Sequence, residues 1–333
     1  MILVTGGTGF LGKHIVSELA QSSHPLRLLV RKPTQAHIQF SSFSKSLEFI
    51  EGDLLDTVSL EKALEGVQKV VHVAGVVSFA RRDRRQMRLV NEQGTANLVN
   101  TCLEKDIEKF VHVSSTSALG RTQENQAINE KSFWQDSPLN TYYGFTKYLA
   151  EKQVFRGVEE GLKAVISNPT IIVGSGEWDE GTPYFFRWID EKNRYWAPAG
   201  SNGFVAAQDV ARAVSLLLDS RFENGERFVL AGENISYVRL LETIARNLGK
   251  KAPSRILPSF WAKKAGFYLE KLASLAGKTP KLTAENMLTS SHSYHYDSTR
   301  FQETFSFRFT PIQQVIEETA QIYLSEKRES SKK

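Results

Sequence analysis

The chain has very little cysteine, since Cys102 is the only one in 333 residues. One cysteine cannot form an internal disulfide, so a disulfide-stapled secreted domain is excluded and a reducing compartment, the cytoplasm, is expected. Uncharged apolar runs of about eighteen residues are also missing, so no transmembrane segment is predicted. The first expected strand begins at residue 2 with no charged leader before it, and we expect no signal peptide.

A large excess of one charge sign is missing as well. The chain has 42 Lys and Arg against 37 Asp and Glu, a net charge of +5. It has no basic stripe interleaved with aromatic residues, so nucleic acid is not an expected partner, and no metal site is predicted. The hydrophobic fraction of 41% is ordinary for a globular protein with a full core. This length fits about two domains, or one large α/β domain that carries a smaller lobe.

Apolar runs alternate with helical patterns along much of the chain, which predicts βαβ units. Helices are expected near 11–20, 59–65, 91–105, 144–160 and 209–219. The expected strands are Ile2–Thr5, Leu26–Val30, Leu47–Glu51, Lys69–Val73, Lys109–Ser114, Lys163–Asn168 and Arg227–Leu230. Right-handed crossovers then give an α/β fold with a doubly wound parallel sheet, whose ligand crevice lies at the carboxyl ends of the strands.

The pattern loosens beyond residue 173. An aromatic stretch runs from Trp178 to Trp196, and from Ile235 onward the chain is mostly helical. We therefore expect a sheet domain of residues 1–173 and 205–232, and a smaller, mainly helical substrate lobe of residues 174–204 and 233–325. Residues 326–333 are poor in apolar side chains and are expected to be a disordered tail.

A glycine-rich turn follows the first expected strand directly. Residues 5–12 read TGGTGFLG and lead into an amphipathic helix. Glycine takes φ > 0 at a tight turn and lets the backbone approach a pyrophosphate, while the helix N-terminus points free N–H groups at the anion. The turn thus predicts a Rossmann dinucleotide site. The residues expected to contact the cofactor here are Gly6, Thr8, Gly9, Phe10, Leu11 and Gly12.

The second strand ends in Arg31 and Lys32, where a dinucleotide site usually has an acidic residue for the ribose 2′-OH. Arg31 at this point is suited to hold a 2′-phosphate through charge-assisted, bidentate hydrogen bonds. This favours NADP(H) over NAD(H) as the cofactor. The alternative is that both cations are solvated loop charges, and NAD(H) then stays open.

Acidic and small residues follow the next two strands. The third strand ends where a carboxylate can accept a hydrogen bond from the adenine amine, and small residues after the fourth let the chain pass near the adenosine ribose. The expected cofactor contacts are Asp53, Leu54, Val73, Ala74 and Gly75. His72, inside the fourth strand, is interpreted as a core histidine with satisfied hydrogen bonds.

Tyr143 and Lys147 are four residues apart on an expected helix, so their side chains share a face. An ammonium beside a phenol favours the phenolate and is expected to lower the pKa of Tyr143 from about 10 toward working pH. Ser115 ends the fifth strand at the same crevice, where its hydroxyl can hydrogen-bond a substrate oxygen while Tyr143 transfers the proton. We expect Ser115 in this role, with Thr116 as the second choice.

Motifs along nearly the whole chain resemble the extended branch of the short-chain dehydrogenase/reductase superfamily, the NAD-dependent epimerase/dehydratase family. They are TGGTGFLG, GDLLD at 52–56, HVAG at 72–75, VNEQGTANLV at 90–99, VSSTSALG at 113–120, YGFTK at 143–147, NPTIIVG at 168–174 and FVAAQDVARA at 204–213.

The resemblance implies roles for particular residues. Ser115, Tyr143 and Lys147 would form the catalytic triad, and Lys147 would also hold the nicotinamide ribose. Asn91 would be the asparagine of the helix behind the active site, counted with the cofactor contacts. Pro169 and Ile172 would approach the nicotinamide. The resemblance also implies a homodimer, formed through a bundle of the helices near 91–105 and 144–160.

The residues after the fifth strand distinguish kinds of extended members. Dehydratases carry Thr-Asp-Glu there and epimerases commonly end the segment in Val-Tyr-Gly, whereas this chain reads STSALG at 115–120. The chain is closest in style to dihydroflavonol reductases and hydroxysteroid dehydrogenases. The aromatic residues of 178–196 suit an apolar or aromatic substrate, although such stretches more often form core.

The resemblance therefore implies an NADP(H)-dependent oxidoreductase that acts on the carbonyl or secondary alcohol of a small molecule. Two alternatives stay open: an NAD-dependent nucleotide-sugar epimerase, and a non-catalytic NADP(H)-sensing module.

Two basic stretches remain. Arg81–Arg85 follows the fourth strand and is interpreted as a solvated helix start. Ile256–Leu275 combines aromatic residues with lysines, and resting on a membrane surface would suit a lipid-like substrate. We expect instead a lid or core helix of the second lobe, and no peripheral membrane contact.

Overall fold

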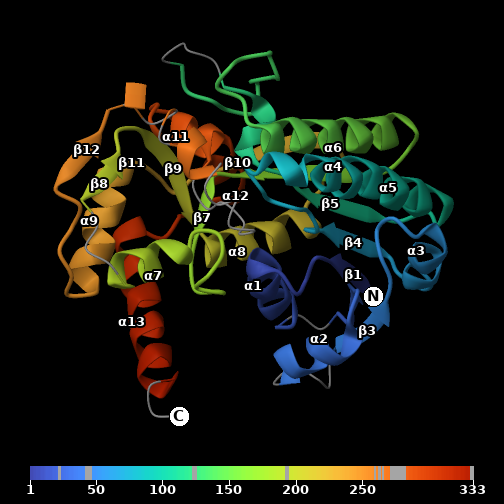
Figure 1. Cartoon of the computed structure of the whole chain (residues 1–333). Coiled ribbons are helices and arrows are strands. Elements are labelled where there is room, and N and C mark those ends of the chain that lie inside the picture. The colour runs from blue at the N-terminus through green and yellow to red at the C-terminus, as the bar shows by residue number, and fades with distance from the viewer. Residues whose placement is uncertain are drawn as a thin grey trace.

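The structure is a computed structural model that describes residues 1–21, 24–41, 47–121, 126–191, 195–258, 260–261, 264, 266–270 and 283–330. A parallel sheet forms its centre, with the strand order β10-β6-β5-β4-β1-β2-β3 (Figure 1). These strands are β1 (Ile2–Thr5), β2 (Leu26–Val30), β3 (Leu47–Glu51), β4 (Lys69–His72), β5 (Lys109–Val113), β6 (Ala164–Pro169) and β10 (Asn224–Leu230). The chain builds outward from β1 to β3, then returns to β4 beside β1 and builds toward β10. The expected doubly wound α/β sheet is confirmed, and its order reverses between β1 and β4, the position at which such sheets bind their ligands.

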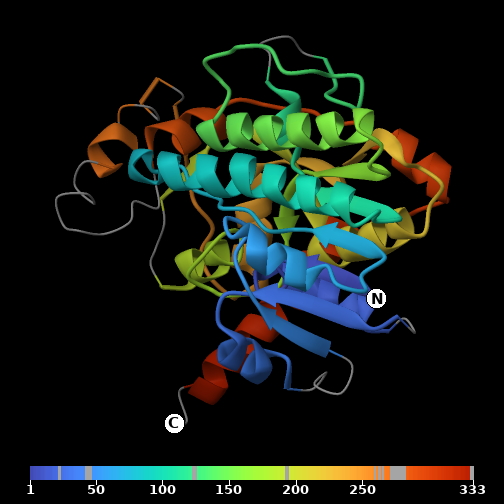
Figure 2. The same ribbon diagram turned by 90° about the vertical axis from the view of Figure 1, so that its right-hand side faces the viewer.

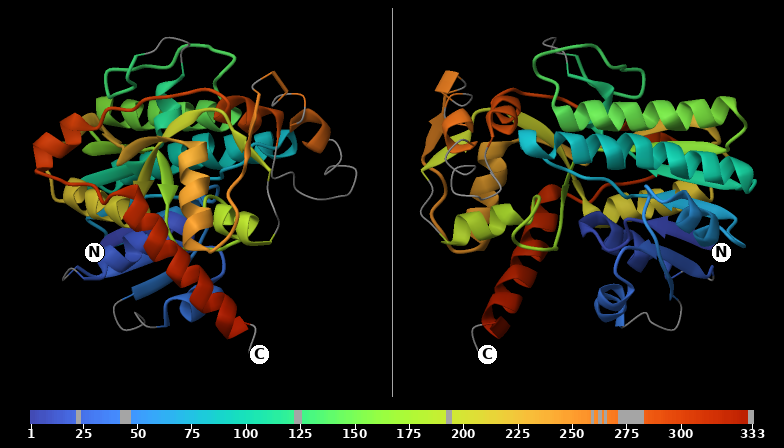
Figure 3. Two further views of the ribbon diagram at one scale, coloured as in Figure 1. Left: turned by 90° about the vertical axis from the view of Figure 1, so that its left-hand side faces the viewer. Right: turned by 45° about the vertical axis from the view of Figure 1, so that its right-hand side comes forward.

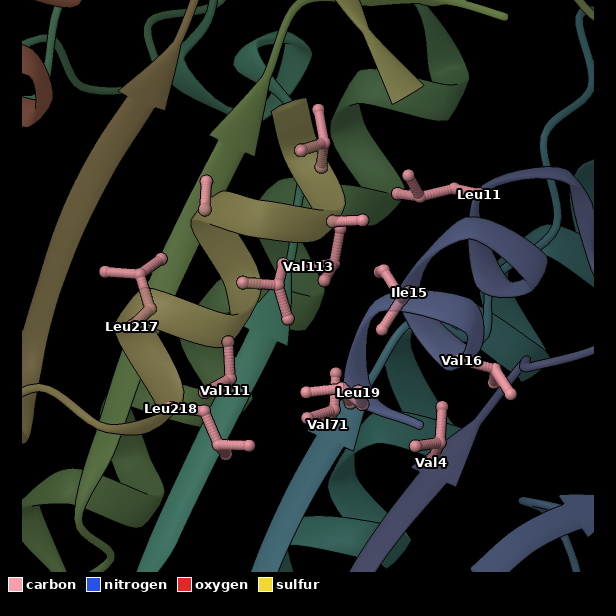
Figure 4. Packing of buried hydrophobic residues seen from close by; sticks show 14 of the residues in the cluster. Val4, Leu11, Ile15, Val16, Leu19, Val71, Val111, Val113, Leu217 and Leu218 are labelled. Carbon is pink, nitrogen blue, oxygen red and sulfur yellow. The ribbon is translucent and has the colours of Figure 1, made fainter. Parts of the chain in front are cut away.

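Helices cover both faces of this sheet. One face carries α1 (Phe10–Leu19), α2 (Pro33–Gln39) and α8 (Ala207–Leu218). Figure 4 shows Ile15 and Leu19 of α1 packed with Val71 and Val111 of the sheet. The other face carries α3 (Thr57–Ala63), α5 (Thr95–Glu104) and α6 (Tyr142–Glu159), and the last two lie side by side in Figure 2. Cys102 is buried in this second layer, where it packs in the core, and burial raises the pKa of its thiol.

A smaller lobe has its own core beyond the sheet. Its helices are α7 (Tyr184–Glu191), α9 (Tyr237–Asn247) and α13 (Ile312–Ser330), and Figure 3 shows α13 extending away from the sheet. They pack on a small sheet of β7 (Ile171–Val173), β9 (Ser201–Ala206) and β11 (Glu233–Ser236). The strands β8 (Trp196–Pro198) and β12 (Arg255–Leu257) form a separate two-stranded parallel sheet. Within the described ranges, no helix is long and apolar enough to cross a bilayer.

This lobe differs from the expected division of the chain. The strand β9 spans the expected boundary at 204/205, and it pairs with β7 from the sheet-domain segment. The helix α12 (Thr299–Phe305) belongs to the expected lobe by sequence, yet Phe301 packs into the core of the central sheet. The expected disordered tail is wrong for residues 326–330, which continue α13 because its apolar face reaches Tyr323 and Leu324 in the lobe core. Residues 331–333 lie outside the described residues.

The aromatic stretch Trp178–Trp196 is mainly core. Phe186 is buried in the lobe core, and Phe185, Trp178 and Trp188 pack against it. Tyr195 and Trp196 are exposed instead. These side chains therefore do not form an aromatic pocket. They no longer support the expectation of an apolar or aromatic substrate.

Candidate active site

The glycine turn between β1 and α1 is shaped by contacts that a side chain would block. Gly6 has a φ of +73°, and a Cβ on it would lie 2.5 Å from the backbone nitrogen of Ala74. A Cβ on Gly12 would lie 2.0 Å from the Gly6 carbonyl oxygen, whereas one on Gly9 would lie 3.4 Å from it. The helix α1 begins directly after Gly9 with no side-chain cap at that residue. Its first N–H groups are therefore available to a pyrophosphate, and the residues fit a dinucleotide.

The other residues of this turn divide between surface and core. Thr8 is exposed, while Leu11 is buried in the sheet core. The ring of Phe10 contacts the ring of His14, with 5.7 Å between the centroids. Phe10 and Leu11 can therefore meet a cofactor through their backbone N–H groups, since their side chains serve packing.

Arg31 and Lys32 lie exposed where β2 ends and α2 begins. The amide Nε2 of Gln39, at the end of α2, donates a hydrogen bond to the Thr8 carbonyl over 3.2 Å. This bond holds α2 against the glycine turn. Two exposed cations beside a phosphate-binding turn fit a further phosphate.

The third strand presents a carboxylate at its end. Asp53 Oδ1 accepts a hydrogen bond from the backbone N–H of Leu55 over 2.9 Å, and the Asp53 N–H donates to Ser59 Oγ over 3.1 Å. These bonds fix the half-buried Asp53 at the crevice. Leu54 is buried, and its carbonyl accepts from Asn97 Nδ2, so its side chain is part of the core.

A chain of hydrogen bonds runs under the crevice through His72. Thr95 Oγ1 donates to the Asn91 carbonyl over 2.6 Å, so it accepts from His72 Nε2, 2.9 Å away. This assigns the His72 proton to Nε2, and Nδ1 then accepts from Thr5 Oγ1 over 2.7 Å. Thr5 Oγ1 in turn accepts from the Ala74 N–H over 3.4 Å. Burial lowers the pKa of His72 to about 3, so the imidazole is neutral and the interpretation as a satisfied core histidine is confirmed.

Asn91 lies in a π-helical turn, η3 (Arg88–Gly94), that leads into α5. Its Oδ1 accepts from the Val76 N–H over 2.7 Å, and its Nδ2 donates to the Val76 carbonyl over 3.0 Å and to Thr146 Oγ1 over 2.9 Å. Asn91 thus joins the loop after β4, which carries Val73 and Gly75, to α6. Its side-chain polar atoms are engaged by the protein, and these bonds hold the loop that carries the expected cofactor contacts.

Ser115 and Tyr143 meet at the carboxyl end of β5. The Ser115 hydroxyl lies close enough to the Tyr143 phenol to oppose the rise in its pKa, and Ser115 Oγ accepts from the Ser117 N–H over 3.1 Å. Thr116, the second choice, is buried and donates to the Pro169 carbonyl over 3.4 Å, so it is directed away from Tyr143. A Cβ on Gly144 would lie 2.7 Å from the Ser117 carbonyl oxygen. The glycine next to Tyr143 therefore lets α6 approach the end of β5 closely.

The pKa of Tyr143 differs from the expectation, and that of Lys147 is also shifted. Burial raises the pKa of Tyr143 to about 12, against the opposing effect of the Ser115 hydroxyl. Burial lowers the pKa of Lys147 to about 8, and Lys147 Nζ donates to the Val113 carbonyl over 2.9 Å. The expected lowering of the Tyr143 pKa by Lys147 is wrong for the free protein, because loss of hydration on burial raises this pKa. Tyr143 is consequently a protonated phenol at neutral pH.

A buried carboxylate next to Lys147 was missed by the sequence reasoning. Glu151 is 1% exposed and lies one helical turn beyond Lys147 on α6. Its Oε1 accepts from Asn168 Nδ2 over 2.6 Å, and its Oε2 lies 3.7 Å from Arg227 Nη1. The charge of Glu151 raises the pKa of Lys147 against the effect of burial. The signal was the spacing of Tyr143, Lys147 and Glu151, each four residues apart on one helical face.

The helix α11 (Ala284–Ser290) closes over the start of α6. Glu285 Oε1 accepts from the Tyr142 N–H over 2.6 Å, and Glu285 Oε2 lies 3.3 Å from Arg84 Nη2. The Arg84 guanidinium stacks on the Tyr142 ring, 4.7 Å from its centroid. The other cations of the 81–85 stretch, Arg81, Arg82 and Arg85, are exposed, which agrees with a solvated helix start.

Comparison with known proteins assigns the chain to a family. A family model described as the NAD dependent epimerase/dehydratase family matches residues 2–231, from the glycine turn to the end of β10. The chain belongs to this extended short-chain dehydrogenase/reductase family.

Relatives of this family member include a putative dihydroflavonol 4-reductase from Synechocystis, 27% identical over 94% of the chain and 91% of the relative. The sterol demethylase protein B of Methylococcus capsulatus is 32% identical over 77% of each chain. The crystal structure of gox2253 is 29% identical, with a TM-score of 0.81 and 98% of each chain covered. The dTDP-glucose 4,6-dehydratase DesIV of Streptomyces venezuelae, solved with NAD, is 19% identical with a TM-score of 0.79 over 97% of this chain and 96% of DesIV, and shows the fold alone.

In this extended family member the predicted site residues come together at one edge of the sheet. Ser115 and Tyr143 are in contact, and Lys147 is anchored beneath them on β5. Pro169 is buried at the end of β6, and Ile172 follows half-buried in β7. Phe79, which the sequence reasoning missed, stands edge-on to Tyr143 with 6.5 Å between ring centroids. Its only sequence signal was its place in the loop after β4, where the crevice opens.

Proposed function

We propose that this family member is an NADP(H)-dependent oxidoreductase that transfers hydride between nicotinamide and the carbonyl or secondary alcohol of a small, apolar or aromatic substrate. The observation that carries the proposal is the placement of Ser115 beside Tyr143 at the carboxyl end of β5, with Lys147 buried one turn along α6. This arrangement supplies a proton donor and a hydroxyl that orients an oxygen.

The protonation state of Tyr143 suits proton donation to a carbonyl oxygen at neutral pH. With a pKa of about 12, Tyr143 carries the proton that a reduced carbonyl oxygen needs. Ser115 donates a hydrogen bond to that oxygen and orients it, while the Lys147 ammonium stabilises the tyrosinate left after the proton moves. The nicotinamide, when bound, supplies the hydride to the carbonyl carbon. Hydride and proton together convert the carbonyl to an alcohol.

The cofactor preference rests on the end of β2. Arg31 and Lys32 are exposed beside the glycine turn, where a 2′-phosphate would meet two cations. Loop solvation of both remains compatible with NAD(H), so the choice is tested by comparing the two cofactors directly. We keep the cytoplasm and a homodimer through α5 and α6 as proposals, and a mass measurement in solution tests the second.

The substrate class draws support from the ring of Phe79 beside Tyr143 and from relatives named as dihydroflavonol, anthocyanidin and steroid enzymes. The alternative of a nucleotide-sugar epimerase predicts tightly retained NAD and a rise in melting temperature with a UDP- or dTDP-sugar. A cofactor sensor predicts NADP(H) binding without turnover of any carbonyl.

Replacing Tyr143 by Phe tests the proposal. The variant keeps the ring and loses the proton, so we expect unchanged NADPH binding and a loss of at least about 10²-fold in turnover on a carbonyl panel followed at the NADPH absorbance. Tyr148→Phe serves as the matched control, because it removes a phenol from the same helix at a ring that stacks on Trp134, with 5.2 Å between the centroids. Unchanged turnover in Tyr143→Phe would overturn the assigned role.

A further inference from the structure

The positive charge of the chain is concentrated in one segment of the second lobe. Residues 250–281 contain eight Lys and Arg and one acidic residue, Glu270, a net charge of +7. The whole chain has a net charge of +5, which leaves −2 for everything else. The same segment has four aromatic residues between positions 260 and 268. Its composition thus differs in kind from the rest of the protein.

Six large apolar side chains described in this segment are exposed, while Leu257 is half-buried. The exposed fractions are 57% for Ile256, 67% for Phe260, 56% for Trp261, 49% for Phe267, 65% for Tyr268 and 43% for Leu269. Of the expected lid or core helix over Ile256–Leu275, the core interpretation is wrong for these six residues because their side chains are exposed. Residues 259, 262, 263, 265 and 271–275 of that range lie outside the described residues. We call the six exposed residues the aromatic patch.

Cations lie on the aromatic patch itself. Lys264 Nζ is 4.5 Å from the centroid of the Phe260 ring and 5.5 Å from that of Trp261. The patch continues onto the β8–β12 pair, where the Arg255 guanidinium is 5.7 Å from the ring of Trp196, which is 47% exposed. Aromatic rings with lysine and arginine among them are the side chains that favour a lipid–water interface.

The aromatic patch is connected to the catalytic end of α6. Residues 266–270 are helical. A Cβ on Gly266 would lie 2.5 Å from the Thr283 carbonyl oxygen and 2.7 Å from the Ala284 Cα, so this helical segment lies against the start of α11. In the same helix α11, Glu285 holds the Tyr142 N–H, next to Tyr143. A surface that received the patch would therefore lie close to the crevice.

We propose that the aromatic patch docks this protein on an anionic membrane surface. The apolar side chains enter the interface, and the Lys and Arg side chains on the patch are attracted to anionic lipid. A second copy of the chain is a poorer occupant, because it would bring two segments of +7 together. Docking itself is independent of the chemistry at Tyr143. A second step, in which docking brings the active site to a substrate dissolved in lipid, rests on the proposed function.

Co-sedimentation of the full chain with vesicles tests this docking. We expect binding to phosphatidylcholine vesicles that contain about 30% phosphatidylserine, at least about tenfold weaker binding to pure phosphatidylcholine, and loss of the difference in high salt. The double variant Phe260→Ser, Trp261→Ser should bind at least about tenfold more weakly, and Lys264→Glu several-fold more weakly. The matched controls are Phe133→Ser, an aromatic residue 68% exposed outside the patch, and Lys62→Glu on α3.

The outcomes separate the proposals. The docking would be overturned if the wild-type protein stayed in the supernatant with both kinds of vesicle. It would also be overturned if patch and control variants, all with unchanged melting temperature, lost vesicle binding equally. A patch variant that keeps vesicle binding but changes the mass in solution would assign the face to a second copy and also overturn it. Tyr143→Phe should bind vesicles like the wild type, so failure of docking and failure of the catalytic assignment are read in different assays.

Discussion

Lys147 makes the stability of the cofactor-free protein depend on pH by an amount that follows from its burial. The side chain belongs to a residue that is 4% exposed, and burial lowers its pKa to about 8 from the ordinary 10.5. Between these values the unfolded chain holds a proton that the folded protein has lost. The free energy of unfolding therefore rises with pH, by up to about 1.4 kcal/mol for each pH unit.

The size of the effect can be worked out for an accessible range. With folded and unfolded pKa values of about 8 and 10.5, Lys147 contributes about 2 kcal/mol of added stability between about pH 7.5 and about pH 9.5. The variant Lys147→Met has a side chain of similar length that does not titrate. The wild type should therefore gain about 2 kcal/mol over this variant across the same range.

Urea unfolding curves at the two pH values, recorded without added cofactor, measure this difference. Titrating groups that do not face Lys147 contribute equally to both proteins and cancel in the comparison. Lys152→Met, an exposed lysine of the same helix, is the matched control and should keep the wild-type rise. If Lys147→Met gains as much stability with pH as the wild type, the buried ammonium described here is not the group that titrates.

Three further variants test the site. Gly12→Ala should lose about 2 kcal/mol or more in urea unfolding, since its Cβ would lie 2.0 Å from the Gly6 oxygen, while Gly9→Ala, with 3.4 Å, should lose much less; equal losses would contradict the turn geometry. Arg31→Ala with Lys32→Ala should raise the KM for NADPH about tenfold and leave that for NADH nearly unchanged; a parallel rise in both would remove the 2′-phosphate argument. Asn91→Leu should lower the free energy of unfolding by about 2–4 kcal/mol, because three hydrogen bonds at Val76 and Thr146 lose their partner; a loss below about 0.5 kcal/mol would show that these bonds do not hold the loop.

The central sheet could be predicted from the sequence because its strands are buried on both faces and appear as apolar runs. The expected Leu26–Val30 and Leu47–Glu51 coincide with β2 and β3, and the expected Lys69–Val73 differs from β4 by one residue. The small sheet of the second lobe could not be predicted in this way. Only Thr170 separates β6 from β7, so the sequence shows one run where the chain enters a second sheet.

The helix α6 shows a second limit of prediction from the sequence. Tyr143 and Lys147 were found from their spacing, since a helical face depends on local sequence alone. Their pKa values depend on burial beneath β5 and on distant side chains, such as Arg227, which faces Glu151 from β10. A local pattern therefore suggested the pair and misjudged the Tyr143 proton.

The hydrogen-bond chain from Ala74 through Thr5, His72 and Thr95 to Asn91 has a consequence for kinetics. Every link donates in one direction, and His72 gains a proton only near pH 3. The hydrogen-bonded groups under the expected cofactor site therefore do not change their protonation state near neutral pH. A pH–rate profile of this protein should then report on the side chains of α6, and a slope near neutrality should not be attributed to the histidine beneath the glycine turn.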